Sequence, residues 1–219
     1  MTTLEKANRV LQVKQINSLL TEHCLYFGRR QTKEELERLW VKQAPDPSFT
    51  QNNGSFVGYE ALQTYYADAE LRRKARYDRI LDQTEPEFRE QGDDLRYGTL
   101  TLSLQTLSTP CIEIAEDGLT AKGTWTVSAQ VTALDQGHPV GFWAYGKLGA
   151  ELAWEEGRFK IWRLTVCTDF LTPAGKPFDP EYGYRVYPAG LGIEETPTVP
   201  GEVYAWYSED RVPSEIPGL

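Results

Sequence analysis

The segment KGTWTVSAQVTA, residues 122–133, decides the fold class because polar and apolar side chains alternate along it. The even-numbered positions are polar, whereas the odd-numbered positions from Trp125 to Ala133 are apolar. A period of two is typical of a β-strand that turns one face to the core and the other to water. The segment therefore predicts a long, half-buried strand.

The residues around this strand predict a sheet. Turn signals that contain a glycine occur at 116–118, 136–137 and 155–157, and such signals are typical of hairpins. We therefore expect three long strands joined by tight turns between Cys111 and Phe170. A strand from Tyr97 to Leu107 is expected before them, followed by a turn at Ser108-Thr109-Pro110.

Arg163 is the unusual residue of the last of these strands. It shares the alternation of Phe159 and Ile161, and if that face is the core, an unpaired guanidinium is costly to bury there. Arg163 then needs an anionic partner, which is either a protein carboxylate such as Asp169 or a ligand. A one-residue slip of the strand would instead turn Arg163 to solvent.

The composition limits the class of protein. The chain has 219 residues and a net charge of -9, from 23 basic and 32 acidic side chains. This length suits one domain with an extension, which buries roughly 70% of its unfolded surface. No cluster of Lys and Arg forms a phosphate-binding track, so we expect no nucleic-acid partner. No apolar run approaches the roughly 20 residues that cross a bilayer, and we expect a cytoplasmic protein without a membrane partner.

Cysteine and histidine patterns give no sign of a metal. Cys24, Cys111 and Cys167 are widely spaced in apolar segments, which suits buried, reduced thiols. Cys24 follows His23, but adjacent helical residues point about 100° apart and do not naturally form a Cys-His dyad. The chain has no metal-ligand spacing, nucleotide fingerprint or phosphate-binding glycine loop. We therefore expect no metal and no cofactor.

Two capping boxes predict the first two helices. Thr2-x-x-Glu5 opens a segment of helical periodicity that ends near Gly28, and Thr32-x-x-Glu35 opens a short helix that stops before Pro45-Asp46-Pro47. A third helix is expected from Tyr59 onward, with an apolar and aromatic face.

Three motifs carry a family resemblance: DGLTAKGTW (117–125), WAYG (143–146) and GRFKIW (157–162). They resemble the strand-rich half of the SnoaL-like branch of the nuclear transport factor 2-like superfamily, and the earlier helices fit it in order, over roughly residues 5 to 170. The resemblance implies an α+β domain with a cone-shaped, cystatin-like fold. In such a fold, N-terminal helices pack in a strongly curved, mainly antiparallel sheet, and a deep pocket lies at the open end.

The domain is expected to cover residues 1–171. Residues 172–219 hold most of the prolines together with scattered aromatic residues. Such a segment does not form regular helices, and its aromatic content argues against simple disorder. We therefore expect an extended C-terminal arm that packs on the domain or on a partner subunit.

His23 is the candidate acid–base residue. The only other histidine, His138, lies in the expected hairpin turn Gln136-Gly137-His138-Pro139. His23 lies on the helical stripe of Leu19, Tyr26 and Phe27. It is either a core histidine satisfied by a polar partner or a catalytic group at a pocket wall, since only histidine has an unperturbed pKa close to neutrality.

One departure from the family pattern concerns the end of the first helix. Dehydratases of the superfamily resemble one another in having a Tyr-Asp pair there, whereas the matching positions in this chain are Phe27 and Gly28. Tyr26 does not simply replace the missing tyrosine, because one residue turns a helical side chain by about 100°.

Two functions are compatible with these residues. The first is a cofactor-independent lyase or isomerase acting on a hydrophobic aromatic or polycyclic substrate, in which His23 exchanges a proton and Arg163 holds negative charge. The second is a non-catalytic ligand-binding or dimerisation module, and a homodimer is expected in either case. The candidate substrate-binding residues are Tyr26, Tyr65, Tyr66, Trp125, Tyr145 and Asp169, most of which also suit a core.

Overall fold

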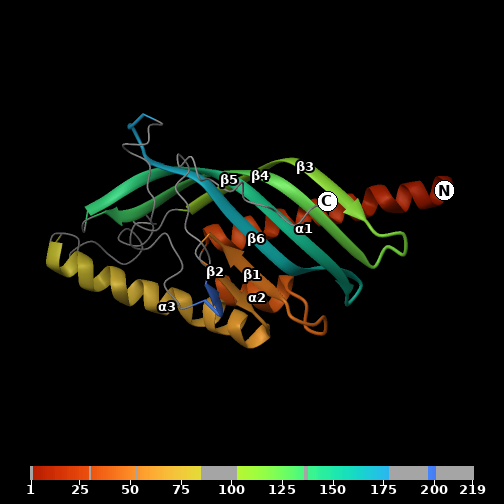
Figure 1. Ribbon diagram of the computed structural model, residues 1–219, viewed down its shortest axis with the longest axis horizontal. Coiled ribbons are helices and arrows are strands. Elements are labelled where there is room, and N and C mark those ends of the chain that lie inside the picture. Colours follow the sequence, from red (N-terminus) through yellow and green to blue (C-terminus); the bar gives the residue numbers. More distant parts are fainter. Residues whose placement is uncertain are drawn as a thin grey trace.

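The computed structural model describes residues 2–29, 31–52, 54–84, 103–135, 138–177 and 197–200. The helices are α1 (Thr3–Gly28), α2 (Thr32–Leu39) and α3 (Tyr59–Thr84). The strands are β1 (Ser48–Gln51), β2 (Gly54–Val57), β3 (Ser103–Ile114), β4 (Thr120–Asp135), β5 (His138–Glu155), β6 (Arg158–Pro173) and β7 (Val199–Pro200). Figure 1 shows the long strands β3 to β6 side by side, with α1 behind them and α3 along one edge.

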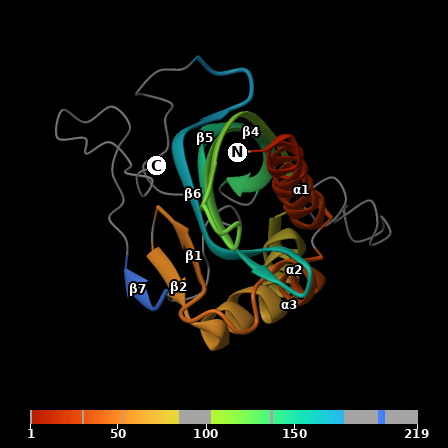
Figure 2. The same ribbon diagram turned by 90° about the vertical axis from the view of Figure 1, so that its right-hand side faces the viewer.

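The strands form one curved sheet in the order β3-β4-β5-β6-β1-β2-β7. Neighbouring strands are antiparallel except for β1 and β6, which are parallel. Figure 2 shows that the sheet bends around one side, on which α1 and α2 lie. The expected α+β architecture, with helices packed in a strongly curved and mainly antiparallel sheet, is confirmed.

The alternation in β4 places the core. Trp125, Val127 and Ala129 are buried, whereas the polar residues between them are partly or fully exposed. Trp125 and Val127 share a core cluster with Ile16 and Leu20 of α1, which are completely inaccessible to solvent, whereas Ala129 packs in a second cluster with Phe142 and Leu171. The predicted half-buried strand is therefore confirmed, and its apolar face is the inner face of the sheet.

The predicted turn at Ser108-Thr109-Pro110 is wrong, because β3 runs through it. The register of β3 on β4 shifts between Ser108 and Cys111, so Thr109 and Pro110 form a bulge in a continuous strand. β3 is an edge strand of the sheet, and an edge tolerates a proline that cannot donate a ladder hydrogen bond. The earlier part of the expected strand, residues 97–102, lies outside the described residues, as does the turn at 136–137.

The two capping boxes have different outcomes. At α1 both reciprocal hydrogen bonds between Thr2 and Glu5 are present, so the first box is confirmed. At α2 the second prediction is wrong, because Thr32 is already helical and its hydroxyl donates to the carbonyl of Tyr66 at 2.6 Å. Glu35 is therefore free of a capping role.

The described part of the C-terminal arm, residues 197–200, adds β7 to the edge of β2. The Thr198 hydroxyl accepts a hydrogen bond from the Val57 amide at 2.9 Å and donates one to the carbonyl of Ser55 at 2.9 Å. The rest of the arm beyond Pro177 lies outside the described residues, and the domain boundary at residue 171 stays a prediction. No helix in the described ranges is long and apolar enough to cross a membrane.

Candidate functional site

A buried histidine–glutamate pair joins the first two helices. His23 Nδ1 lies 2.8 Å from Glu35 Oε1, and the two side chains are 2% and 0% exposed. His23 follows the buried stripe of α1 that contains Ile16, Leu19 and Leu20. Glu35 lies on the buried face of α2. Helical periodicity thus brings an imidazole and a carboxylate together inside an otherwise apolar core.

Aromatic and sulfur-containing side chains surround this pair. Burial, followed by the charge of Glu35, raises the pKa of the Cys24 thiol to about 12. The same two causes, in the same order, raise the pKa of the Tyr66 hydroxyl well above its usual value. Both groups therefore stay protonated at neutral pH, and Cys24 carries no thiolate for nucleophilic chemistry.

Two further polar atoms at this site, Glu35 Oε2 and Trp40 Nε1, are fully buried. Both side chains interact with the Tyr66 hydroxyl and affect its pKa through hydrogen bonding. The Trp40 ring packs edge-on against Tyr66, with centroids 5.6 Å apart. Burial of polar side chains is costly unless they have polar partners. The gathering of His23, Glu35, Trp40 and Tyr66 inside the core marks this region as a candidate functional site.

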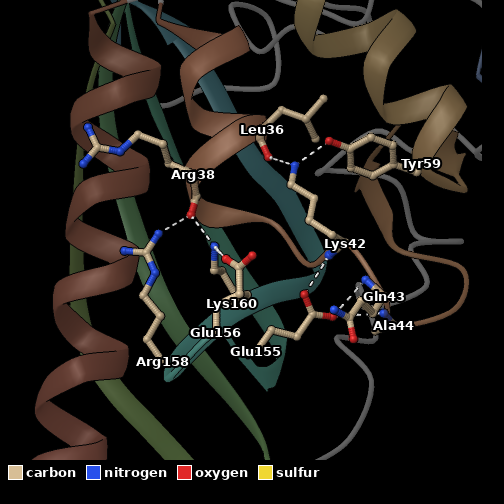
Figure 3. A network of polar contacts seen from close by, with 10 residues as sticks. All are labelled: Leu36, Arg38, Lys42, Gln43, Ala44, Tyr59, Glu155, Glu156, Arg158 and Lys160. Carbon is tan, nitrogen blue, oxygen red and sulfur yellow. Dashed lines mark hydrogen bonds and ion pairs between the residues drawn. The ribbon is translucent and has the colours of Figure 1, made fainter.

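A second network fixes the end of α2, and so the position of Glu35 (Figure 3). Lys42 Nζ donates to the carbonyl of Leu36 at 2.8 Å, and Lys160 Nζ donates to the carbonyl of Arg38 at 3.0 Å. The Arg158 guanidinium donates to the same Arg38 carbonyl. Cationic groups at a helix C-terminus satisfy its free carbonyls and complement its dipole. The network therefore anchors α2 to the start of β6.

Glu155 holds the chain that leaves α2. Its carboxylate accepts backbone hydrogen bonds from Lys42 at 2.8 Å and from Gln43 and Ala44 at 3.0 Å each. Figure 3 shows these contacts beside the cationic side chains. One carboxylate thus satisfies three consecutive amides, which orders the segment that follows Trp40.

The predicted inner-face residues lie in the core. Tyr65 and Tyr66 are 5% and 2% exposed, with ring centroids 5.1 Å apart. Trp125 is 3% exposed and donates to Asn17 Oδ1 at 3.2 Å. Tyr26 is partly buried against the same core. The structure thus gathers Tyr66 at the His23–Glu35 pair and packs Tyr65, Trp125 and Tyr26 into the surrounding core.

The prediction that Arg163 shares the inner face with Phe159 and Ile161 is wrong. The latter two are buried, but a bulge at Trp162 follows them, and Arg163 returns to register opposite Glu151. Because side chains alternate with a period of two, the extra residue turns the side chains that follow it to the opposite face of the sheet. Arg163 Nη1 lies 3.0 Å from Glu151 Oε2, and its side chain is 42% exposed.

Asp169 is not the partner of Arg163 either. Its carboxylate lies 3.7 Å from Lys147 Nζ. Tyr145 pairs in register with Ser128, which belongs to the polar face of β4, so Tyr145 lies on the outer face of the sheet. Tyr145, Asp169 and Arg163 are therefore not brought together with His23.

The sequence analysis missed Glu35 and Trp40 as site residues. Glu35 was assigned to a capping box, and its alternative role has no local signature because its partner lies twelve positions away on another helix. The available signal was the helical stripe of Thr32, Glu35, Leu36 and Leu39, which places Glu35 on the buried face of α2. A carboxylate on a buried helical face requires a polar partner.

These elements define an α+β domain whose curved sheet covers helices with a buried acid–base pair. The family model of the SnoaL-like domain matches residues 8–165, and the chain belongs to this SnoaL-like family. No match was found among curated proteins.

Several solved structures share the fold. A putative scytalone dehydratase from Novosphingobium aromaticivorans DSM 12444 has a TM-score of 0.55 and 14% identity, covering 78% of this chain and 99% of its own. LinA has a TM-score of 0.54 and 15% identity, and the match covers 80% of this chain and 98% of LinA. The hexachlorocyclohexane dehydrochlorinase LinA-type3 from Novosphingobium barchaimii LL02 has a TM-score of 0.53 and 14% identity. This match covers 80% of this chain and 99% of the dehydrochlorinase.

Proposed function

We propose that this chain is a cofactor-independent acid–base enzyme of the lyase or isomerase kind, acting on a hydrophobic aromatic or polycyclic small molecule. The observation that carries the proposal is the buried His23–Glu35 pair. The names of two fold relatives, a putative dehydratase and a dehydrochlorinase, describe eliminations of water and of hydrogen chloride, which agrees with this class.

The contact between His23 and Glu35 suits general-base chemistry, and because both side chains are buried, a substrate has to enter the core to reach them. A Glu35 carboxylate beside Nδ1 favours the imidazole tautomer with its proton on Nδ1, which leaves Nε2 of His23 as the base. Nε2 takes a proton from a substrate carbon, a double bond forms, and the leaving group departs with its electron pair. In an isomerisation, Nε2 instead returns the proton to another carbon. Glu35 stabilises the imidazolium that exists between the two steps.

The energetic cost of the pair supports a functional role. An ionised carboxylate taken into a protein interior loses several kcal/mol of hydration, which a single histidine offsets only in part. Sequences retain such local violations most often at functional sites. Tyr66, which is protonated, contributes a neutral hydroxyl near Glu35. We propose Tyr26, Tyr65, Tyr66 and Trp125 as the residues that shape the substrate site.

A non-catalytic ligand-binding or dimerisation module is the second candidate. It is favoured by one observation: the guanidinium expected to hold negative charge on a substrate, that of Arg163, is paired with Glu151 on the outer face. In this case the His23–Glu35 pair serves only to fix α1 against α2.

Substrates from the names of the fold relatives provide the first test. The purified full chain, without added cofactor, is incubated with scytalone and with hexachlorocyclohexane. In parallel, α-proton exchange of 1-tetralone and 2-tetralone in D₂O is followed by NMR. We expect at least one of these reactions to proceed, and its rate should be about 10²- to 10⁴-fold lower in His23→Gln. Glu35→Gln should also be slower, because the amide does not stabilise the imidazolium.

His138→Gln serves as the control, because it removes the other histidine of the chain and should leave the rate unchanged. A reaction that proceeds equally in His23→Gln overturns the proposed mechanism. If none of the four reactions is detected, the proposed enzyme activity is overturned and the non-catalytic ligand-binding or dimerisation module is favoured. Native mass spectrometry of gently purified protein would then identify a bound compound.

A further inference from the structure

A hollow of about 300 Å³ lies between one face of α1 and the start of β6. This volume is at the lower end of the range for small-molecule sites, which is roughly 300–1,000 Å³. The lining residues that decide its chemistry are Lys14, Ser18, Leu19 and Glu22 of α1 and Arg158 and Phe159 of β6. Neither His23 nor Glu35 belongs to the described lining, so the hollow is separate from the buried pair.

The floor of the hollow is apolar and firmly packed. Leu19 and Phe159 are 5% and 2% exposed and belong to the main core cluster. The Phe159 ring lies edge-on to Trp154, with centroids 5.2 Å apart and an interplanar angle of 90°. Such a floor favours a ligand with an apolar body, and an aromatic ring gains an additional ring contact with Phe159.

The wall of the hollow carries three charges: Lys14 and Glu22 on α1, and Arg158 on β6. Lys14 is exposed and Glu22 is half-buried. Within the described ranges, neither of these two side chains takes part in an ion pair or a hydrogen bond. Two positive charges and one negative charge leave one positive charge in the wall, although the whole chain has a net charge of -9. The hollow therefore suits a ligand with a single negative charge.

Arg158 is the residue best placed to hold that negative charge. A guanidinium has five N–H donors, and that of Arg158 donates to the carbonyl of Arg38 (Figure 3). This contact fixes the side chain, and no second hydrogen-bond acceptor engages the guanidinium in the part of the chain that the structure describes. The remaining donors are free to bind a carboxylate through two parallel hydrogen bonds. Lys160 also donates to the Arg38 carbonyl, at 3.0 Å, so that carbonyl keeps a partner if Arg158 turns to a ligand.

We propose that this hollow binds a small aromatic monocarboxylate. The aromatic ring lies on Leu19 and Phe159, and the carboxylate accepts hydrogen bonds from Arg158. Lys14 adds attraction at the rim, whereas the Glu22 carboxylate disfavours a ligand with a second negative charge. The binding needs no turnover, so it holds or fails independently of the acid–base role of His23.

Titration of the ¹⁵N-labelled full chain, followed by two-dimensional NMR, tests the proposal with two probes of the same shape. Sodium 3-phenylpropanoate should bind with a Kd below about 1 mM, and the uncharged 3-phenylpropanamide at least about tenfold more weakly. Arg158→Gln should weaken binding of the carboxylate about 10- to 100-fold. Glu22→Gln should strengthen it about threefold, because a like charge is removed. Lys6→Gln, which removes an exposed cation of α1 outside the hollow, is the control and should leave the Kd unchanged.

A bulky side chain at Ser18 keeps the test valid if the Arg158 variant fails to fold. Ser18 is an exposed residue of α1 that lines the hollow, so Ser18→Trp should fill the space and abolish binding of the carboxylate. Thr21→Trp, at an exposed α1 position outside the hollow, should bind it as the unmodified protein does. The proposal is overturned if the unmodified protein binds neither probe, if both probes bind equally, or if binding persists unchanged in Ser18→Trp or in folded Arg158→Gln.

Discussion

His23 Nδ1 lies 2.8 Å from Glu35 Oε1, and this contact joins α1 to α2 in a region where neither side chain reaches solvent. The pair connects residues twelve positions apart that belong to different helices. Its isolation from water makes each partner the main source of polar stabilisation for the other. Substitution of one partner alone should therefore be more harmful than substitution of both.

A double-mutant cycle tests this dependence. We expect His23→Leu and Glu35→Leu each to lower the free energy of unfolding by about 3–5 kcal/mol, because each leaves a buried polar group without its partner. The double variant should lose much less than the sum, since two apolar side chains need no partner. Urea unfolding gives the values, with Glu34→Leu, at an exposed position of α2, as control. Additive losses would contradict the coupling.

Two cationic residues close together on β6 should differ in their contribution to stability. The Lys160 side chain is 4% exposed and donates to the carbonyl of Arg38, so Lys160→Met should cost about 1.5–3 kcal/mol. Arg163 is 42% exposed, and Arg163→Met should cost about 0–1 kcal/mol. Urea midpoints and slopes for the two variants measure the difference. Equal losses would show that the contacts of Lys160 with the Arg38 carbonyl and with Glu156, at 3.0 Å each, contribute no more than the exposed pair of Arg163.

Stability should fall in alkaline solution. The pKa of Cys24 is about 12 in the folded protein, against an ordinary value of 9.0. Above pH 9 the unfolded chain therefore loses this proton while the folded chain keeps it, and the free energy of unfolding decreases as the pH rises from about 9 toward 12. The buried Tyr66 acts in the same direction, because its pKa is also raised.

Urea unfolding between pH 7 and pH 10.5 measures this dependence. Cys24→Ala should reduce the slope above pH 9 without removing it, because Tyr66 still contributes. Iodoacetamide at pH 8, read out by peptide mass spectrometry, should modify the exposed Cys111 faster than Cys24. An equal slope in Cys24→Ala, or faster alkylation of Cys24, would contradict the raised pKa.

The contact of the arm segment with β2 depends on a glycine. A Cβ at Gly54 would lie 2.5 Å from Pro197 Cγ, and the backbone φ of 150° also disfavours a side chain. Gly54→Ala should displace residues 197–200 and remove the bond from the Val57 amide to Thr198. Hydrogen exchange at Val57 should then accelerate. Gly175→Ala, also at positive φ but with open space around its Cβ position, should leave that exchange rate unchanged.

Local patterns were sufficient for most of the architecture. The alternation around Trp125 predicted both the strand and its buried face, because a strand exposes alternate side chains whatever lies around it. The capping box at Thr2 and Glu5 predicted the start of α1, since both of its hydrogen bonds form within one helical turn. The same local reasoning was wrong for Thr32, whose hydroxyl has a partner on α3 instead.

The sequence by itself determined the fold class, the long strands β4 to β6 and the placement of His23 on a buried helical stripe. Only the tertiary structure decided the partner of His23 and the side of the sheet on which Arg163 lies. The first depends on how α2 packs against α1, and the second on one extra residue, Trp162, in the register of β6 on β5. Periodicity describes one element at a time, whereas a bulge and a buried hydrogen-bonded pair exist only between elements.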